Sequence, residues 1–320
     1  MYFLATVWNP NETLFKIGFL QIKYYNLLWI TAFVVGWFLM KRIFNSEKKT
    51  PEQLDSLLIH SLLATMLGAR LGHVFFYDWD YYKDHLLEIL LPIRERAGST
   101  LFGFIDGYEF TGFTGLASHG ATIGMIIAMY FFVRKQKDIK FFWLLDRLTI
   151  PFAIGAAAVR LGNFFNSEIV GKIIKEPAFY AVQFIRNTDD LRPSTALGKT
   201  GKKTLNAAYD AIENNSQFSD LLASIPYRHP AQLYEAICYV FVFLIVYYIY
   251  WKTDLKNKPG FLIGLFFVLL WTVRFFIEFV KERQNALDQS LELLSIGQWL
   301  SIPFILLGLY FMFRPVKAAA

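Results

Sequence analysis

Cysteine occurs only once in the 320 residues, as Cys238. A single cysteine cannot form a disulfide within the chain, and it excludes a metal site built from several cysteine ligands. Cys238 lies in the apolar run Ala236-Ile-Cys-Tyr-Val240, where the ordinary role of a cysteine is that of a small buried hydrophobic residue. A nucleophilic cysteine needs a polar neighbourhood, which this run does not offer.

Charged residues are also scarce, at 18% of the chain, whereas hydrophobic residues make up 55% and aromatic residues 18%. Soluble domains are about 45–50% apolar and about 25% charged, so this composition favours a membrane protein. The net charge of +6 would suit a nucleic acid. The basic residues, however, cluster directly after apolar runs, where membrane topology places them, and we predict no nucleic-acid partner.

Seven apolar segments have a length near the roughly 20 residues that a helix needs to cross a bilayer. They predict an all-α polytopic membrane protein with seven transmembrane helices in a single membrane domain, residues 1–317. The three final alanines, 318–320, are interpreted as an artificial tail. The expected spans are 19–40, 57–77, 116–133, 141–160, 232–251, 260–279 and 297–313. The fourth is the weakest of them, because Asp146 and Arg147 lie inside it.

Basic residues follow the first, third, fifth and seventh of these spans. Short loops rich in lysine and arginine stay in the cytoplasm, so the N-terminus is predicted outside and the C-terminus inside. The start of the chain has no basic segment of the kind that precedes a cleaved signal sequence, and the first span is expected to be retained. The basic residues are Lys41, Arg42, Lys48, Lys49, Arg134, Lys135, Lys137, Lys140, Lys252, Lys256, Lys258, Arg314 and Lys317.

Two segments between spans are long enough to have structure of their own on the outer side. Residues 78–115 form a predicted outer-surface arm, in which Leu86, Leu87, Leu90 and Leu91 would share one helical face. That pattern predicts a surface amphipathic helix lying on the outer leaflet. Residues 172–228 are polar and rich in turn-forming residues, and they predict a small external subdomain. We find no internal repeat of the kind that many transporters carry.

Polar residues on six of the spans are expected to meet at the level of the outer leaflet. Ionisable residues inside a membrane are costly, and they indicate a functional site by default. Arginine side chains at this depth suit a phosphate, which the guanidinium group binds through two parallel hydrogen bonds. The predicted set is Tyr25, Arg70, His119, Arg160, Asn163, Asn166, Glu168, Arg228, His229, Gln232, Tyr234, Glu235, Arg274 and Glu278.

Simpler explanations exist for some members of this set. Arg274 and Glu278 are four residues apart and could pair only with each other. Arg70 could extend to lipid headgroups, and His119 could be an ordinary core histidine. Glycines flank the set and permit close approach of helices or of a ligand. These glycines are Gly120, Gly124, Gly162 and Gly171. The residues alone therefore predict a phospholipid headgroup site open to the outer leaflet.

The segment from Arg160 to Gly171, RLGNFFNSEIVG, resembles the signature of prolipoprotein diacylglyceryl transferases, with Arg160, Asn163, Glu168 and Gly171 at the matching offsets. Other segments resemble this family in order and spacing: Gly68-Ala-Arg-Leu-Gly72, His119-Gly-Ala-Thr-Ile-Gly124, Arg228-His-Pro-Ala-Gln-Leu-Tyr-Glu235, and Arg274 followed by Glu278. The chain departs from the family pattern at Ala121, Thr122 and Leu270, the last standing where the family usually has a tyrosine.

The resemblance implies a bacterial cytoplasmic-membrane enzyme. Its substrates would be phosphatidylglycerol and a prolipoprotein signal peptide, whose lipobox cysteine thiol displaces glycerol-1-phosphate and forms a thioether. Arg160 and Arg274 are expected to stabilise the departing phosphate. Histidine titrates near pH 6.5, so His119 is expected to be either the general base for the thiol or a ligand of the headgroup. We expect no cofactor and no metal.

Binding roles are expected for the remaining members of the set. The predicted substrate-binding residues are Tyr25, Arg70, Gly120, Gly124, Asn163, Glu168, Gly171, Arg228, His229, Gln232, Tyr234, Glu235 and Glu278, with Gly171 expected in a turn. Two other classes of protein remain open from the residues alone. One is a protein that binds or transports phospholipids without chemistry. The other is a structural subunit whose charges pair internally.

Overall fold

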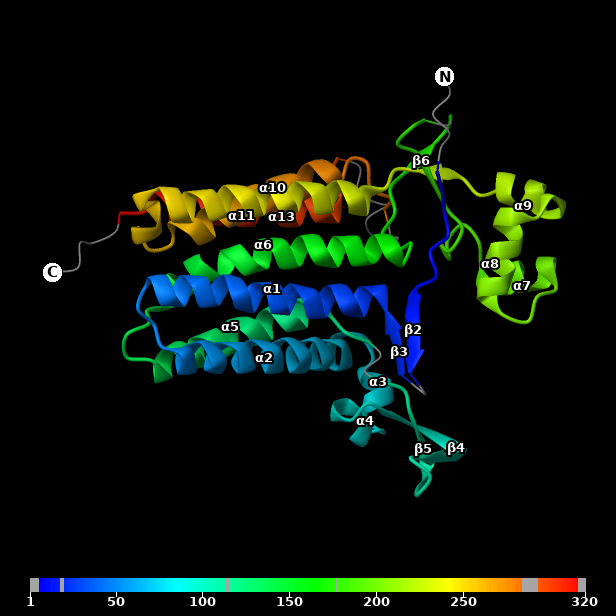
Figure 1. The fold of residues 1–320 in the computed structure, drawn as a ribbon, viewed down its shortest axis with the longest axis horizontal. Helices are drawn as coiled ribbons and strands as arrows, with labels where there is room; N and C mark the ends of the chain where they lie inside the picture. Colours follow the sequence, from blue (N-terminus) through cyan, green and yellow to red (C-terminus); the bar gives the residue numbers. More distant parts are fainter. Residues whose placement is uncertain (1–5, 18–19, 113–114, 177, 284–292, 316–320) are drawn as a thin grey trace. The chain divides into compact units, whose positions relative to one another are not determined.

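The computed structural model describes residues 6–17, 20–112, 115–176, 178–283 and 293–315. The alanines at 318–320, interpreted above as an artificial tail, lie outside the described residues. The chain is mostly helical and forms two compact units (Figure 1). Unit 1 consists of Met1–Leu39 and Leu145–Ala320, and unit 2 consists of Met40–Leu144.

Each of the seven predicted spans overlaps a helix. These helices are α1 (Tyr24–Ser46), α2 (Pro51–Tyr77), α5 (Ser118–Lys135), α6 (Phe141–Phe165), α10 (Ala231–Lys252), α11 (Phe261–Ile277) and α13 (Ile296–Phe313). Among the described residues, α1, α2, α6, α10 and α13 are long and apolar enough to cross a membrane, and α11 is a shorter apolar helix. The chain is therefore a multi-pass membrane protein, whereas the count of seven spans stays a prediction.

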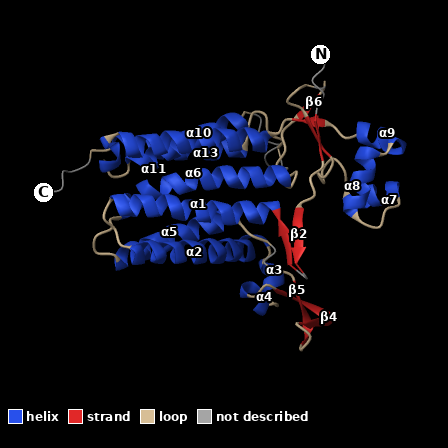
Figure 2. Ribbon diagram, in the orientation of Figure 1, coloured by secondary structure: helices blue, strands red, loops and turns tan. Residues whose placement is uncertain are grey.

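The prediction of an all-α chain is wrong in detail, because short strands form three small sheets (Figure 2). Strand β2 (Thr13–Ile17) pairs with β3 (Leu20–Lys23) in an antiparallel hairpin. Helix α1 therefore begins at Tyr24, later than the predicted start of the first span at residue 19. Strands this short bury too little surface to produce a clear alternating pattern in the sequence.

The predicted external subdomain, residues 172–228, has a fold and a core of its own. Its helices are α7 (Pro193–Thr200), α8 (Leu205–Asn214), α9 (Ser219–Ala223) and the 3-10 turn η1 (Ser216–Phe218). They enclose the buried residues Ile185, Leu191, Ala196, Ala208, Tyr209, Ile212 and Ile225. Unit 1 also contains a four-stranded sheet in the order β1-β7-β8-β6. Its strands are β1 (Thr6–Trp8), β7 (Val182–Phe184), β8 (Tyr227–Arg228) and β6 (Ile173–Ile174).

The predicted surface helix is not one continuous helix. Residues 78–115 contain the short helices α3 (Trp79–Tyr82) and α4 (Leu87–Leu90), followed by a hairpin of β4 (Ile93–Leu101) and β5 (Ile105–Phe110). Pro92 ends α4, because proline cannot continue a helix. Arg70 also donates to the carbonyl oxygens of Glu88 and Ile89, which a longer helix would use. The four leucines of the expected apolar face, Leu86, Leu87, Leu90 and Leu91, are nevertheless exposed.

Asp146 and Arg147, the charges inside the weakest predicted span, are buried and hold the start of α11. The Asp146 carboxylate accepts hydrogen bonds from the backbone amides of Gly260 (2.7 Å) and Ile263 (2.9 Å). The first amides of a helix have no partner within the helix, so this carboxylate satisfies them. Arg147 donates to the carbonyl of Lys256 (3.1 Å), next to the 3-10 turn η2 (Asp254–Asn257).

Basic segments contact one another within each unit. In unit 1, Lys258 donates to the Met312 carbonyl (2.6 Å) and Arg314 donates to the Pro259 carbonyl (3.1 Å). The end of α10 and the end of α13 therefore lie together. In unit 2, Lys49 pairs with Asp138 (2.6 Å), which joins the loop after α1 to the loop after α5.

Four glycines allow α2 and α5 to pack closely in unit 2. A Cβ atom added at Gly124 would lie 2.7 Å from the Ala64 carbonyl oxygen and 3.0 Å from the Gly68 Cα. One added at Gly72 would lie 2.5 Å from the Gly120 Cα. Of the two roles predicted for Gly120 and Gly124, the structure shows close helix approach. Their substrate-binding role stays a prediction.

A Gly124→Val substitution is expected to destabilise unit 2, because its side chain would push α5 away from α2. Overpacking of this kind costs about 1–3 kcal/mol. The measurement is the thermal unfolding midpoint of the full-length protein in detergent. Gly155→Val is the matched control in α6, since a Cβ atom at Gly155 has no neighbour within 4 Å. Equal midpoints for both variants would contradict the packing role.

Candidate phosphate site at the end of the helix bundle

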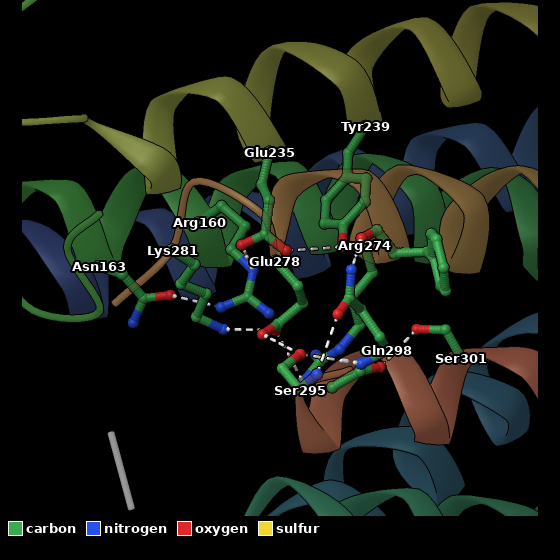
Figure 3. Close-up of polar contacts among 12 residues, drawn as sticks. Arg160, Asn163, Glu235, Tyr239, Arg274, Glu278, Lys281, Ser295, Gln298 and Ser301 are labelled. Carbon is green, nitrogen blue, oxygen red and sulfur yellow. Dashed lines mark hydrogen bonds and ion pairs between the residues drawn. The ribbon is translucent and has the colours of Figure 1, made fainter. Parts of the chain in front are cut away.

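Arg160 and Glu235 form an ion pair between α6 and α10, at the ends of these helices opposite to the basic segments of unit 1. Arg160 Nε lies 2.9 Å from Glu235 Oε2 (Figure 3). The Glu235 side chain is 1% exposed and that of Arg160 is 16% exposed. Each charge compensates for the other in apolar surroundings, where either one alone would be strongly unfavourable.

The turn after Arg160 is held by side-chain amides. Asn163 Nδ2 donates to Glu168 Oε1 (2.7 Å), and its Oδ1 accepts a long hydrogen bond from Arg160 Nη1 (3.4 Å). Gln232 Nε2 donates to the Glu168 carbonyl (2.7 Å). The structure thus brings together Arg160, Asn163, Glu168, Gln232 and Glu235, as predicted from the sequence.

Arg274, on α11, lies in the same group, but its distance to a carboxylate oxygen is longer than that of Arg160. Its Nη2 is 3.9 Å from Glu278 Oε1. That carboxylate also binds Lys281 Nζ (3.1 Å) and Ser295 Oγ (3.1 Å). Within the described part of the chain, Arg274 Nε is buried and has no hydrogen-bond acceptor. Since buried polar groups are normally paired, this N–H group is available to an anionic ligand.

Tyr239 is a member of this group that sequence analysis missed. Its hydroxyl donates to Glu235 Oε1 (3.2 Å), and the side chain is buried. It also interacts electrostatically with Arg160 and Arg274. Figure 3 shows Arg160, Glu235 and Tyr239 pointing toward one another. The only sequence signal was the four-residue spacing from Glu235, which places both side chains on one face of a helix.

Lys281 and Ser295 were also missed. They follow α11 and precede α13, respectively, and both bind Glu278. Ser295 forms a capping box with Gln298 at the start of α13. Gly297 provides the space for the Glu278 side chain, because a Cβ atom there would collide with the carboxylate. A capping box is readable in a sequence, but its contact with a carboxylate from another helix is not.

Arg228, a predicted substrate-binding residue, is occupied by protein acceptors. It donates two hydrogen bonds to the Asp190 carboxylate (2.6 and 2.7 Å) and one each to Glu282 (2.9 Å) and the Gly171 carbonyl (3.0 Å). Burial alone would lower the pKa of Arg228, but the hydrogen bonds to Asp190 and Glu282 outweigh it and raise the pKa. The structure therefore shows Arg228 fixing the subdomain to the chain after α11.

Gly171 is not in the expected turn. It forms a β-bridge with Lys281, and its amide donates to the His229 carbonyl (2.9 Å). A Cβ atom at Gly171 would lie 2.6 Å from His229 Cβ and 2.7 Å from the Val280 carbonyl oxygen. The position thus requires glycine because two backbone segments approach closely there.

His229 and Tyr234 lie together beside this bridge, with the His229 ring stacked on Tyr180 at 5.5 Å between ring centres. His229 Nδ1 is 3.5 Å from the Tyr234 hydroxyl. Burial lowers the pKa of His229, so its ring is neutral at pH 7. The Tyr25 ring packs against α6 at Gly162, where an added Cβ atom would lie 2.5 Å from the ring.

Arg70 and His119 belong to unit 2, and their relation to Arg160 stays a prediction. Arg70 is 5% exposed and lies over the Tyr82 ring, 4.7 Å from its centre. His119 is in the first turn of α5, exposed, beside the rings of Phe76 and Tyr77.

Within the described residues, the side chains close enough to share a metal ion are those of His85, Glu88 and Glu95, also in unit 2.

Comparison with known proteins identifies the family. The model described as prolipoprotein diacylglyceryl transferase matches residues 12–314. Three curated relatives bear the name phosphatidylglycerol–prolipoprotein diacylglyceryl transferase. The Bacteroides fragilis protein is 34% identical over 97% of this chain and 95% of its own length. The Tolumonas auensis protein is 36% identical over 98% of this chain and 98% of its own length. The Chloroherpeton thalassium protein is 34% identical over 98% of this chain and 95% of its own length. The chain belongs to the prolipoprotein diacylglyceryl transferase family, as the signature residues predicted.

Replacing Arg228 by alanine is expected to destabilise the protein strongly, because Asp190 would remain buried without its partner. Breaking a buried pair in this way costs about 3–5 kcal/mol. The unfolding midpoint in detergent measures the effect. Arg192→Ala is the matched control, since Arg192 is exposed nearby on the subdomain. If Arg228→Ala kept the midpoint of the wild type and lost only activity, a substrate-binding role would replace the structural one.

Proposed function

We propose that this chain transfers the diacylglyceryl group of phosphatidylglycerol to the lipobox cysteine of a prolipoprotein, at the site built around Arg160 and Arg274. Membership of the family supports the reaction. The cysteine sulfur attacks the glyceryl carbon as a thiolate. A carbon–sulfur bond forms, the carbon–oxygen bond to phosphate breaks, and glycerol-1-phosphate leaves with the bond's electron pair.

One observation carries the assignment of the phosphate site: in the described part of the chain, the buried Nε of Arg274 has no acceptor. The leaving phosphate gains negative charge, so cationic donors stabilise the transition state more than the ground state. Arg274 lies 3.9 Å from the Glu278 carboxylate, which Lys281 and Ser295 contact more closely, at 3.1 Å each. An anionic ligand would accept the hydrogen bond for which Arg274 Nε has no acceptor among the described residues.

Arg160 contributes the second guanidinium group. Its Nε lies 2.9 Å from Glu235 Oε2, and its Nη1 donates a long hydrogen bond to Asn163 (3.4 Å). Tyr239 also interacts with Arg160. The roles of Asn163, Glu168, Gln232 and Glu235 are then to position Arg160, and Tyr239 extends this network toward Arg274. Pre-organised donors of this kind do not have to reorient during the reaction.

The site is proposed to face the outer leaflet, with seven spans, the N-terminus outside and the C-terminus inside. Two observations support this orientation. The basic segments gather at one end of the helices in each unit, and such segments stay in the cytoplasm. Arg160 and Arg274 lie near the C-terminal ends of α6 and α11, whereas the basic contacts of Lys256 and Lys258 are at their N-terminal ends.

Alanine at Arg160 or Arg274 is expected to reduce turnover by about 10²–10³, the usual effect of losing one transition-state donor. The assay incubates purified protein with phosphatidylglycerol and a lipobox peptide, and it measures released glycerol-1-phosphate and thioether-linked peptide. Arg192→Ala is the control. Lipid binding without release in the wild type would favour a lipid carrier, and normal turnover of either arginine variant would refute its role.

His119 is proposed as the general base that removes the thiol proton. His119→Asn keeps a polar side chain but cannot take up the proton near neutral pH. We expect a lower rate and loss of the rate's dependence on histidine ionisation between about pH 5 and 8. A variant with an unchanged rate and pH profile would assign His119 to headgroup binding or to packing against Phe76 and Tyr77.

A further inference from the structure

Three potential metal ligands converge in the segment between α2 and α5, within unit 2. His85 lies before α4, Glu88 lies in α4, and Glu95 lies in β4. One ligand atom of each residue lies within 4.8 Å of the others, and His85 Nε2 is 3.6 Å from a Glu95 carboxylate oxygen. Neither the family assignment nor the proposed transfer reaction uses these residues.

The imidazole of His85 is held in the orientation of a metal ligand. Its Nδ1 lies 2.9 Å from the Tyr81 carbonyl oxygen. A carbonyl only accepts hydrogen bonds, so Nδ1 donates its proton to Tyr81 and Nε2 is the ring nitrogen that faces Glu95. The ring also stacks on Tyr81, with 4.2 Å between the ring centres. Metal-binding histidines typically have such a carbonyl partner on the second ring nitrogen.

The Glu88 carboxylate is fixed in a similar way. Glu88 is 3% exposed, although glutamate is rarely buried without a partner that needs its charge. One of its oxygens accepts from the Tyr81 hydroxyl (2.9 Å) and the other from the Glu95 amide (2.7 Å). Each carboxylate oxygen has two lone pairs, so both retain one for a metal ion.

We propose that His85, Glu88 and Glu95 bind a divalent transition-metal ion of the zinc type. Histidine nitrogens and glutamate oxygens are both zinc ligands, with bonds of about 2.0–2.2 Å. Two ligands of a tetrahedral ion then lie about 3.4 Å apart, close to the separation of His85 and Glu95. Glu95 is 60% exposed, so its side chain is free to close on an ion entering from solvent.

Two arginines lie beside this position. Arg94 interacts with Tyr81 and Glu88, and Arg70 donates to the Glu88 carbonyl. The Glu88 and Glu95 carboxylates balance these two charges and include the direct ligands. A bound ion would join α4 to the start of β4, and thereby hold the exposed leucines next to the hairpin. The three residues would leave the fourth position of a tetrahedral ion to water, whereas closed structural zinc sites have four protein ligands.

The test uses the full-length protein in detergent, stripped with a chelator and dialysed against zinc chloride. Metal content per chain is measured by mass spectrometry. We expect one zinc ion bound to the wild type, and affinity at least about tenfold lower in His85→Gln and Glu95→Gln, since even indirect contacts of a metal site change affinity by 10–100-fold. Glu95 is exposed, so its variant is expected to fold normally, which the unfolding midpoint without zinc verifies.

Matched controls remove the same chemical groups elsewhere in unit 2. Glu109→Gln removes a carboxylate of the same hairpin that pairs with Arg96 (2.8 Å). His73→Gln removes a histidine that lies 4.0 Å from Asp78. Both are expected to keep the zinc ion. A wild type that binds no zinc, or a bound ion that the His85 and Glu95 variants retain, would overturn the proposal and leave a simple His85–Glu95 ion pair.

Discussion

The buried ion pair between Arg160 and Glu235 is the interaction on which the rest of the site depends. Transfer of either charge into apolar surroundings costs several kcal/mol unless the other is present. The pair therefore fixes the end of α6 against the start of α10. Asn163 and Glu168 attach the following turn to it, and Tyr239 attaches it to the neighbourhood of Arg274.

The arginines of this chain differ in how many of their donors the protein itself uses. Arg228 has a bidentate carboxylate, a second carboxylate and a carbonyl, so it functions as a structural connector. Arg70 donates to two backbone carbonyls and stabilises the turn at α4. Arg274 is the opposite case, since its buried Nε has no acceptor among the residues that the structure describes. Residue type and depth in the membrane do not distinguish a structural arginine from one that is available to a ligand. The hydrogen-bond partners of each arginine do.

The helices were predictable because a bilayer imposes one length and one composition on each of them. The group formed by Arg160, Asn163, Glu168, Gln232 and Glu235 was predictable because two motifs carry it, the signature at 160–171 and the segment at 228–235. The hairpin of β4 and β5 was not, since its exposed strands alternate little in polarity. Asp190, the partner of Arg228, lies in a loop without a pattern, and only the folded subdomain brings the two side chains together. Contacts of this kind depend on tertiary structure and leave no periodic signal.

The first described strand also has a consequence for the timing of biogenesis. Strand β1 runs parallel to β7, pairing Thr6 with Val182 and Trp8 with Phe184, and the Trp8 indole donates to the Phe164 carbonyl (3.0 Å). The ribosome makes β1 and then must add some 170 residues before β7 exists. At 5–20 residues per second this interval lasts roughly 10–35 s. Strand β1 therefore lacks this partner until β7 has been made, and the proposed phosphate site, which also needs Glu235 and Arg274, is completed later still.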